Sequence, residues 1–262
     1  IARIGGGDFS ASIPVATGME NSVLGWLSET QIKLRDLDRE RKSDAVKIRH
    51  LSQIYAALSQ CNQAIVRCTS EQALFSQICR DMVQFGGIKM AWIGMLDEAS
   101  QQVRPVASYG DEMGYLEGIV ISLDPADPSG QGPTSTAMRE KQPFWCQDFA
   151  RDPRTAPWRE RGECSGWGAS ASLPLLRKGE VVGSFNLYSG ETNAFDDAVR
   201  NLLIEMAQDI SFALDNFVRE ADRQQAANAL RESEARYRAV TQSASDAIVT
   251  ADGAGNIVGW NR

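Results

Sequence analysis

The segment between residues 145 and 172 gathers most of the side chains in this chain that could do chemistry. It holds two cysteines, Cys146 and Cys164, and an arginine-rich stretch around Arg159. A thiol becomes a good nucleophile when its pKa is lowered, and a neighbouring guanidinium group can lower it. Guanidinium groups also bind carboxylates and phosphates through paired hydrogen bonds. The segment is therefore compatible with a thiol site or with an anion site.

The charges of this segment leave two interpretations open. In the first, its acidic residues pair with its arginines at the surface, and neither has a further role. In the second, one or two arginines point inward and fix a small anion or an organic acid, which makes Asp148 and Arg159 candidate site residues. The residues concerned are Arg151, Arg154, Arg159 and Arg161, with Asp148, Asp152, Glu160 and Glu163.

Tryptophans flank the same segment. A group of indoles beside a polar loop is typical of a binding cavity with an apolar wall, although the indoles could also simply fill the space between loop and sheet. The run from Gly166 to Ser172 is otherwise made of small residues, so close packing requires either the indoles or a ligand to fill the volume above it. The candidate ligand-binding residues are Trp92, Trp145, Asp148, Trp158, Arg159, Cys164, Trp167, Ser170, Ser172 and Phe185.

Composition excludes several classes of function. The chain has 262 residues and a formal net charge of −7, which argues against a nucleic-acid partner. His50 is the only histidine, so a metal site with several histidines is excluded and a Ser-His-Asp device is not expected. The 5 cysteines show no CxxC spacing and indicate reduced thiols. No apolar run of about 18 residues is present to span a membrane.

Hydrophobic spacing indicates the elements that must position these residues. Apolar residues three and four apart predict helices over 51–68, 71–85 and 198–217. Alternating patterns predict two hairpins, 89–110 and 169–189, the second with its turn at 177–179. Shorter elements are a strand at 118–123, a helix at 134–141 with Thr134 or Ser135 near its N-cap, a strand or edge segment at 142–149 and a long connection at 150–168.

This order predicts an α+β fold. Strands bracketed by terminal helices favour a central antiparallel sheet with helices on one face. Only the region 124–168 is left to cover the other face. We therefore expect covering loops there, closing a cavity over the sheet, with long helical linkers at both ends of the domain.

At these motifs the chain resembles a GAF domain. The resemblance is carried by KMAWIGMLD with VRPVASYG, by GPTSTAMREKQPFWCQDF, and above all by the closing hairpin SLPLLRKGEVVGSFNLYS. It covers 51–218. It implies a small ligand held between the sheet and the covering loops. No cysteine is followed by histidine, and His50 lies in the leading helix, so a bilin and a haem are both disfavoured, and no cofactor is certain.

Two flanking resemblances accompany it. Residues 1–30 resemble part of a HAMP signal-relay module, although Met19-Glu20-Asn21 stands where that family usually has an Asp-Glu pair. Residues 237–262 resemble the start of a PAS domain. Linker helices are expected at 31–50 and 219–236.

The combination implies a sensory or regulatory input module of a bacterial signalling protein. The output of that protein, cyclic-di-GMP turnover or a histidine kinase, would lie outside this chain. The module would lie on the cytoplasmic side of an inner membrane, with any membrane anchor upstream of this chain. The fragment itself is not expected to be an enzyme. The alternatives are a ligand-free spacer and, through Cys146 and Cys164, a thiol-dependent reductase of free methionine sulfoxide, which some GAF proteins are.

The terminal helices are expected to carry the signal. Their apolar stripes predict a parallel homodimer in which a ligand changes the pairing of the helices. The expected dimer and relay residues are Leu51, Ile54, Leu58, Ile65, Leu203, Met206, Ile210 and Phe217.

Overall fold

A computed structural model of the chain describes residue 13, residues 22–243 and residues 248–260. Its helices are α2 (Val23–Arg67), α3 (Glu71–Gln84), α4 (Pro133–Glu140), α5 (Arg159–Ser165) and α6 (Asp197–Ser243), with 3₁₀ turns η1 (Pro128–Gly130) and η2 (Pro153–Trp158). Its strands are β1 (Met90–Asp97), β2 (Gln102–Tyr109), β3 (Phe144–Cys146), β4 (Ala169–Arg177), β5 (Glu180–Ser189), β6 (Val249–Ala251) and β7 (Ile257–Trp260).

The first five strands form one antiparallel sheet in the order β2-β1-β5-β4-β3. Both predicted hairpins are confirmed. The β4–β5 turn places Lys178 and Gly179 at φ values of 51° and 82°, the left-handed conformations that a two-residue turn between twisted strands requires. The N-terminal and C-terminal hairpins of the sheet thus meet along β1 and β5, which pair directly.

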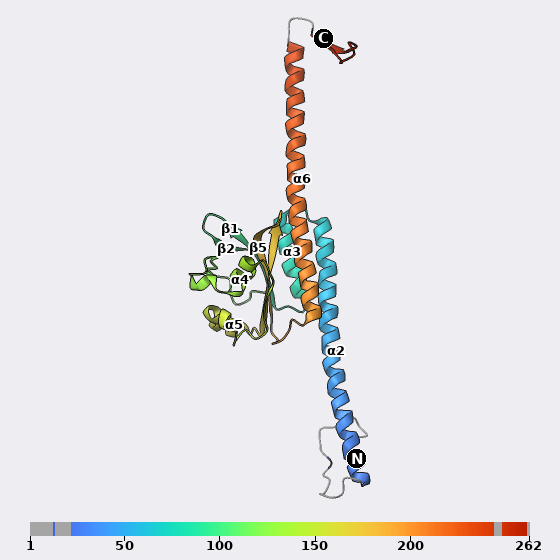
Figure 1. Ribbon diagram of the computed structural model, residues 1–262, viewed down its shortest axis with the longest axis vertical. Coiled ribbons are helices and arrows are strands. Elements are labelled where there is room, and N and C mark those ends of the chain that lie inside the picture. Colours follow the sequence, from blue (N-terminus) through green and yellow to red (C-terminus); the bar gives the residue numbers. More distant parts are fainter. Residues whose placement is uncertain (1–12, 14–21, 244–247, 261–262) are drawn as a thin grey trace.

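The sheet is covered on both faces, as Figure 1 shows. Helices α2, α3 and α6 lie on one face, and α4, α5 and the segments around them lie on the other. This confirms the predicted α+β class, with helices on one side and a covering layer on the other.

The helix-side core follows from strand alternation. Odd-numbered residues of β4 and β5, such as Leu173, Phe185 and Leu187, point at the helices and are completely buried. They meet apolar residues spaced three and four apart on the helices, including Ile54 on α2 and Leu203 on α6. The result is a continuous aliphatic core between one face of the sheet and three helices.

The two long helices leave this core in opposite directions (Figure 1). Helix α2 has 45 residues, and its first turn is capped by the Ser22 side chain, which accepts a hydrogen bond from the Gly25 amide. Helix α6 has 47 residues and begins after Asp196, whose carboxylate accepts from the Val199 amide. Neither helix breaks at residue 50 or 218, where domain boundaries are expected from the sequence.

Three expectations from the sequence need correction. Residues 118–123 form no strand, and only Ser122 makes an isolated bridge, to Gln102; Ile119, Ile121 and Leu123 pack on the covered face of the sheet. Gly132, with Pro133 after it, is the N-cap of α4 in place of Thr134 or Ser135. The connection 150–168 contains η2 and α5.

The flanking modules remain predictions. Most of the HAMP-like segment lies outside the described residues. At the other end, β6 and β7 pair into an antiparallel hairpin where the start of a PAS domain is expected. Within the described residues, no helix is both long enough and apolar enough to cross a membrane.

Candidate functional site

The floor of the candidate site is the face of the sheet that points away from the long helices. Two rows of paired residues cross it. Trp92 on β1 faces Asn186 on β5, which faces Ser172 on β4 and then Phe144 on β3. The next row runs from Met90 through Tyr188 and Ser170 to Cys146. Serine, asparagine and tyrosine replace the aliphatic residues of the opposite face, so this floor is polar at its centre.

Four aromatic rings form the wall at one end of this floor. Tyr188 rises from β5, and Trp167 packs on it with ring centroids 4.1 Å apart. Tyr115, from the segment after β2, meets the same indole edge-on at 4.1 Å. The ring centroid of Phe149 lies 5.7 Å from that of Trp167 and 6.0 Å from that of Tyr188. Such edge and tilted contacts give the wall a fixed shape.

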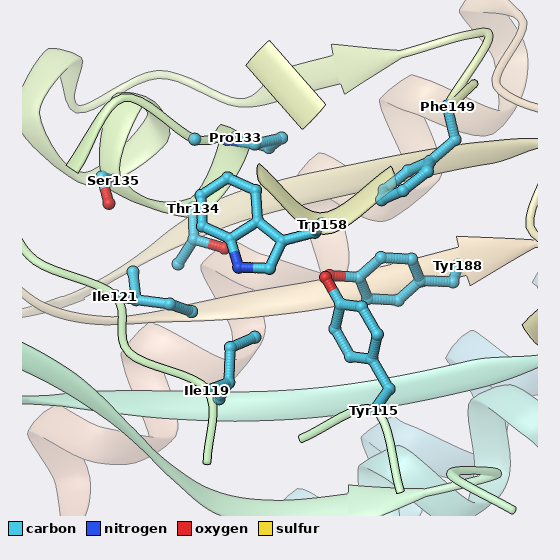
Figure 2. A pocket seen from close by; sticks show the side chains of 10 residues that line it. Tyr115, Ile119, Ile121, Pro133, Thr134, Ser135, Phe149, Trp158 and Tyr188 are labelled. Carbon is cyan, nitrogen blue, oxygen red and sulfur yellow. The ribbon is translucent and has the colours of Figure 1, made fainter. Parts of the chain in front are cut away.

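A pocket opens between this wall and the first turn of α4 (Figure 2). The space left in it is only about 10 Å³, roughly the room of one water molecule. The indole of Trp158 occupies the middle of the view, between Thr134 and the two tyrosines. The pocket is lined by Tyr115, Ile119, Ile121, Gly132, Pro133, Thr134, Ser135, Phe149, Trp158 and Tyr188.

Buried hydrogen bonds fix the polar centre of the floor. The Asn186 carbonyl oxygen accepts from the hydroxyls of Thr134 at 2.9 Å and Ser184 at 3.1 Å. The Asn186 amide group donates to the Ser184 carbonyl at 3.1 Å. Ser135 donates to the Ser122 carbonyl at 2.7 Å, which ties α4 to the segment after β2. The first turn of α4 is therefore held against the sheet and the segment after β2 by side-chain hydrogen bonds.

Two buried polar groups on the floor lack a partner of good geometry among the described residues. They are the Trp92 indole nitrogen and the Ser170 hydroxyl. The indole lies near the Tyr188 phenol, and the hydroxyl lies near the Cys146 thiol. Unsatisfied groups of this kind are uncommon in a well-packed interior and are frequent at binding sites.

The titratable groups of the floor are held neutral. Burial raises the pKa of Tyr115 and of Tyr188, so both phenols keep their protons near neutral pH. Burial, with a smaller contribution from Asp152, raises the pKa of Cys146 to about 11. A thiol with this pKa is a poor nucleophile. No set of three metal-binding side chains occurs among the residues that the structure describes.

The arginines of the covering layer do not enter the pocket. Arg161 donates to the carbonyls of Tyr115 and Glu117 at 3.2 and 3.0 Å and so joins α5 to the segment after β2. Arg159 donates to the Asp152 carbonyl at 3.3 Å. Arg154 lies over the Phe144 ring, and Arg151 pairs with Asp148 at 3.7 Å. Neither Arg159 nor Asp148 lines the pocket, and that they meet a ligand stays a prediction.

The structure divides the predicted aromatic set between the two faces of the sheet. Trp92, Trp158 and Trp167 lie on the pocket side, as expected. Trp145 and Phe185 do not, because they alternate with pocket-facing neighbours and so point at the helices. Phe185 is completely buried in the helix-side core, and Trp145 packs 5.8 Å from Phe195 beneath Arg200. Their assignment to the cavity is wrong.

The remaining predicted site residues lie at the edges of the pocket or below it. Ser170 and Ser172 are buried in the floor. Cys164 is exposed on α5, apart from the buried Cys146. Sequence analysis missed Tyr115, Phe149, Thr134, Asn186 and Tyr188. The period of two in Ser184, Asn186 and Tyr188 was the available signal, since it marks a polar face opposite Phe185 and Leu187.

The predicted relay residues lie in the helix-side core or against it, and whether these helices also contact a second copy stays a prediction. They pack within one chain: Ile54, Leu58, Leu203, Met206 and Ile210 belong to the helix-side core, and Leu51, Ile65 and Phe217 pack against it. These stripes are therefore already used by the sheet and the other helices. The apolar residues left exposed on these helices are different ones, including Tyr55, Val66 and Phe212.

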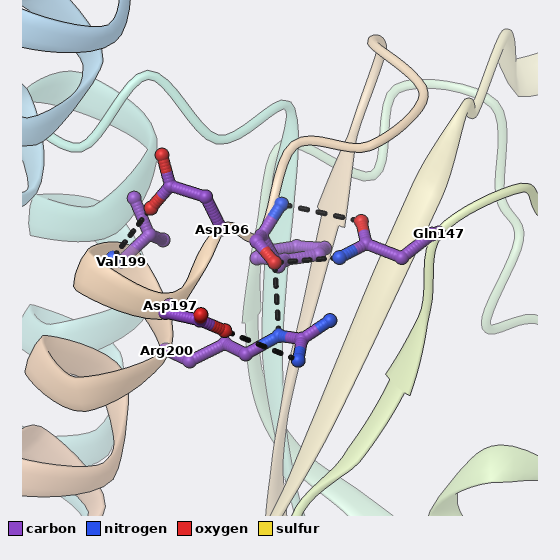
Figure 3. Close-up of polar contacts among 6 residues, drawn as sticks. Gln147, Asp196, Asp197, Val199 and Arg200 are labelled. Carbon is purple, nitrogen blue, oxygen red and sulfur yellow. Dashed lines mark hydrogen bonds and ion pairs between the residues drawn. The ribbon is translucent and has the colours of Figure 1, made fainter.

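A direct link joins the pocket floor to the start of α6 (Figure 3). Gln147 follows Cys146, and its side-chain amide donates to the Phe195 carbonyl at 2.5 Å and accepts from the Phe195 amide at 3.3 Å. Arg200 in the first turn of α6 donates to the same carbonyl at 2.9 Å. The end of β3 and the beginning of α6 are thus fixed to one backbone group.

Solved structures with this fold include a free methionine-R-sulfoxide reductase of Neisseria meningitidis in complex with its substrate. It is 17% identical, with a TM-score of 0.54, and covers 64% of this chain and 91% of its own. The GAF domain of a Coxiella burnetii phosphoenolpyruvate-protein phosphotransferase is 12% identical, with a TM-score of 0.53 over 67% and 98% of the two chains. The corresponding Acinetobacter domain is 13% identical, with a TM-score of 0.51 over 64% and 97%.

At these identities the similarity concerns the fold alone. No curated protein sequence matches the chain. The model of one family does, over residues 68–215, which span the five-stranded sheet, the covering layer and the buried part of α6. With that match and this architecture, the chain belongs to the GAF domain family.

Proposed function

We propose that this chain is a sensory or regulatory input module that binds a small molecule between the sheet and its covering layer. The observation that carries the proposal is the asymmetry of the sheet. One face is sealed by aliphatic packing, whereas the other combines an aromatic wall, a hydrogen-bonded polar floor and two unsatisfied buried groups. Such a combination is typical of a ligand pocket.

A path for the signal is built into the same region. A ligand above Cys146 and Tyr188 would bear on β3, and Gln147 links β3 to Phe195 and the start of α6. A shift of β3 would therefore move the first turn of α6, which continues far beyond the domain. For this to transmit a signal, the ligand must bind two arrangements of this junction unequally.

We propose further that the module acts as a homodimer through its long helices. The contact must use the faces that the helix-side core leaves free, and Tyr55, Val66 and Phe212 are 56%, 84% and 57% exposed there. The expected HAMP and PAS neighbours, the membrane-anchored parent and an output in cyclic-di-GMP or histidine-kinase signalling belong to this proposal.

One observation favours the alternative, a GAF spacer without a ligand. The pocket is filled by Trp158 to within about 10 Å³, so the domain is well packed as it stands. The enzyme alternative has less support, because Cys146 is buried with a raised pKa and Cys164 is exposed. We therefore propose that the fragment is not catalytic.

Native mass spectrometry of the gently purified chain, followed by denaturing extraction, tests the proposal. A sensor should carry or acquire a reproducible extra mass, which should be lost in Asn186→Leu if the floor binds it. Gln147→Ala should keep the ligand but uncouple it, so that ligand no longer alters hydrogen exchange in the first turns of α6. A bare mass that does not change in metabolite extract, with unchanged exchange in α6, would instead support the spacer.

A further inference from the structure

The pocket is occupied by one of the protein's own side chains. Trp158 lies at the junction of η2 and α5, and its indole reaches back over the first turn of α4 (Figure 2). Around it stand Thr134, Ile121, Tyr115 and Tyr188. The Trp158 indole therefore occupies the position that a ligand of the proposed function would need. The shape and chemistry of this indole indicate which compounds the pocket can accept.

The contact with Gly132 shows how closely this indole is inserted. A Cβ atom added at Gly132 would lie 2.3 and 2.4 Å from Cη2 and Cζ3 of the Trp158 ring. Gly132 has a φ of −75°, an ordinary value for any residue, so the backbone itself does not require glycine. What requires it is the indole, which lies where a side chain would be.

The indole is wedged in but not tied down by polar contacts. Among the described residues its ring nitrogen has no hydrogen-bond partner, and the residue is only half-buried. Trp158 also ends one helical turn and begins the next, at φ −113° and ψ 6°. Rotation of its side chain would therefore vacate the pocket without breaking a hydrogen bond.

The lining sets the chemistry of whatever replaces it. No charged side chain is among the described residues of the lining, and the nearby arginines are bound to carbonyls of the covering layer. A charged ligand would lose its water without gaining an opposite charge, which is costly. The polar groups that are present are the Thr134 and Ser135 hydroxyls, the two neutral phenols and the amides at the start of α4.

From this geometry we infer that the pocket takes an uncharged, planar, bicyclic aromatic compound of about the size of indole, and that it binds by displacing Trp158. The inference rests on the proposed function and deepens it. The aromatic wall would stack against the ring of such a ligand, and Thr134 with the first turn of α4 would meet its one or two hydrogen-bonding groups. Trp158 competes with this ligand for one space.

Titration with indole itself, followed by calorimetry, tests the inference on the full chain. The Trp158 side chain must leave the pocket before added indole can enter. The apparent affinity of the wild type for indole is therefore reduced in proportion to the fraction of molecules in which Trp158 is out of the pocket. Trp158→Ala removes the competitor, and its empty apolar cavity should bind indole at least tenfold more tightly than the wild type. Gly132→Ala places a methyl group where the ring lies, so it should exclude a bound indole as well as the Trp158 side chain and weaken indole binding. Trp26→Ala changes a tryptophan that is 66% exposed on α2 and should match the wild type.

The charged analogue indole-3-carboxylate provides the chemical control. It should bind Trp158→Ala at least tenfold more weakly than indole does. Equal binding of the two compounds, equal indole affinity in wild type and Trp158→Ala, or no indole binding to a folded Trp158→Ala would each overturn the inference. If Trp158→Ala does not fold, Trp158→Leu, which removes the ring and fills less of the pocket, decides the same question.

Failure here can be separated from failure of the proposed function. A charged metabolite recovered from the purified chain would overturn the ligand class while leaving the sensory pocket in place. No extra mass in any variant, together with no indole binding, would overturn both.

Discussion

The two faces of the central sheet are built from the same five strands but differ in composition and in packing. The helix side is aliphatic and closed, with Leu173, Phe185 and Leu187 fully buried against three helices. The pocket side presents Ser172, Asn186 and Tyr188, each directly adjacent in sequence to one of these residues on the same strands. Because side chains alternate across a strand, a single hairpin can supply both a stability core and a polar floor.

The difference shows where each face can tolerate change. Aliphatic packing is non-directional and gains free energy from every buried methylene. The pocket side relies on hydrogen bonds between elements that are far apart in sequence, such as Thr134 with Asn186 and Arg161 with Tyr115. A rearrangement there exchanges a few directional contacts, while the helix side stays intact. The second face is therefore the one suited to a conformational response.

The sharpest test of this contrast is Phe185→Ala. The ring is completely buried between β5 and the helices, so its loss should cost about 3–5 kcal/mol of unfolding free energy. Urea unfolding monitored by far-UV circular dichroism measures it. Met113→Ala, at a position 67% exposed in the segment after β2, is the control and should stay within about 0.5 kcal/mol of the wild type. A small effect of Phe185→Ala would mean that the helix side is not the stability core.

On the pocket side, Thr134→Val keeps the shape of the side chain and removes its hydroxyl. The Asn186 oxygen then retains only Ser184 as a donor, and the expected cost is about 1 kcal/mol. Ligand affinity should fall in the same variant, whereas Phe185→Ala should change affinity little in the molecules that remain folded. Thermal unfolding with and without ligand separates the two outcomes. Equal loss of affinity in both variants would remove the distinction between the faces.

Sequence patterns were sufficient for the two hairpins, the helices on one face of the sheet and the class of fold. The alternation in 89–110 and 169–189 predicted both hairpins, and the three-four spacing predicted the helices that pack on them. These are local signals, and each repeats several times within its segment. The predicted order of helices and strands left one arrangement of layers, which the structure confirms.

The prediction from the same patterns was wrong about the face of Phe185 and could not assign partners. Phe185 was placed in the pocket for its size, although the period of two in β5 puts it opposite the polar face that carries Tyr188. Likewise, the stripe from Leu51 to Ile65 looks the same whether it packs within the chain or against a second copy. Tyr115, Thr134 and Asn186 come together from separate segments, and no local spacing in the sequence links them.

A smaller loss of stability is expected from substitutions in the covering layer. Arg161→Met removes two hydrogen bonds to the segment after β2, and Arg151→Met removes only an exposed pairing with Asp148. The first change should lower global stability by about 0.5–1 kcal/mol and speed hydrogen exchange around Tyr115. The second should do neither. Identical exchange in the two variants would show that Arg161 does not hold this side of the pocket.

The smallest effect near neutral pH should come from titration of the pocket floor. Burial raises the pKa of Cys146 from 9.0 to about 11, so the folded state holds this proton more tightly than the unfolded state does. The stabilisation is complete below about pH 9 and is lost as the pH rises through 9 toward 11, because the unfolded chain then gives up its proton first. The free energy of unfolding measured with urea should therefore be constant from pH 6 to 8 and lower at pH 10. In Cys146→Ser the free energy of unfolding should decline less steeply over that range, whatever its value at pH 7. Parallel curves of stability against pH for the variant and the wild type would mean that the Cys146 thiol is not buried as its place in β3 implies.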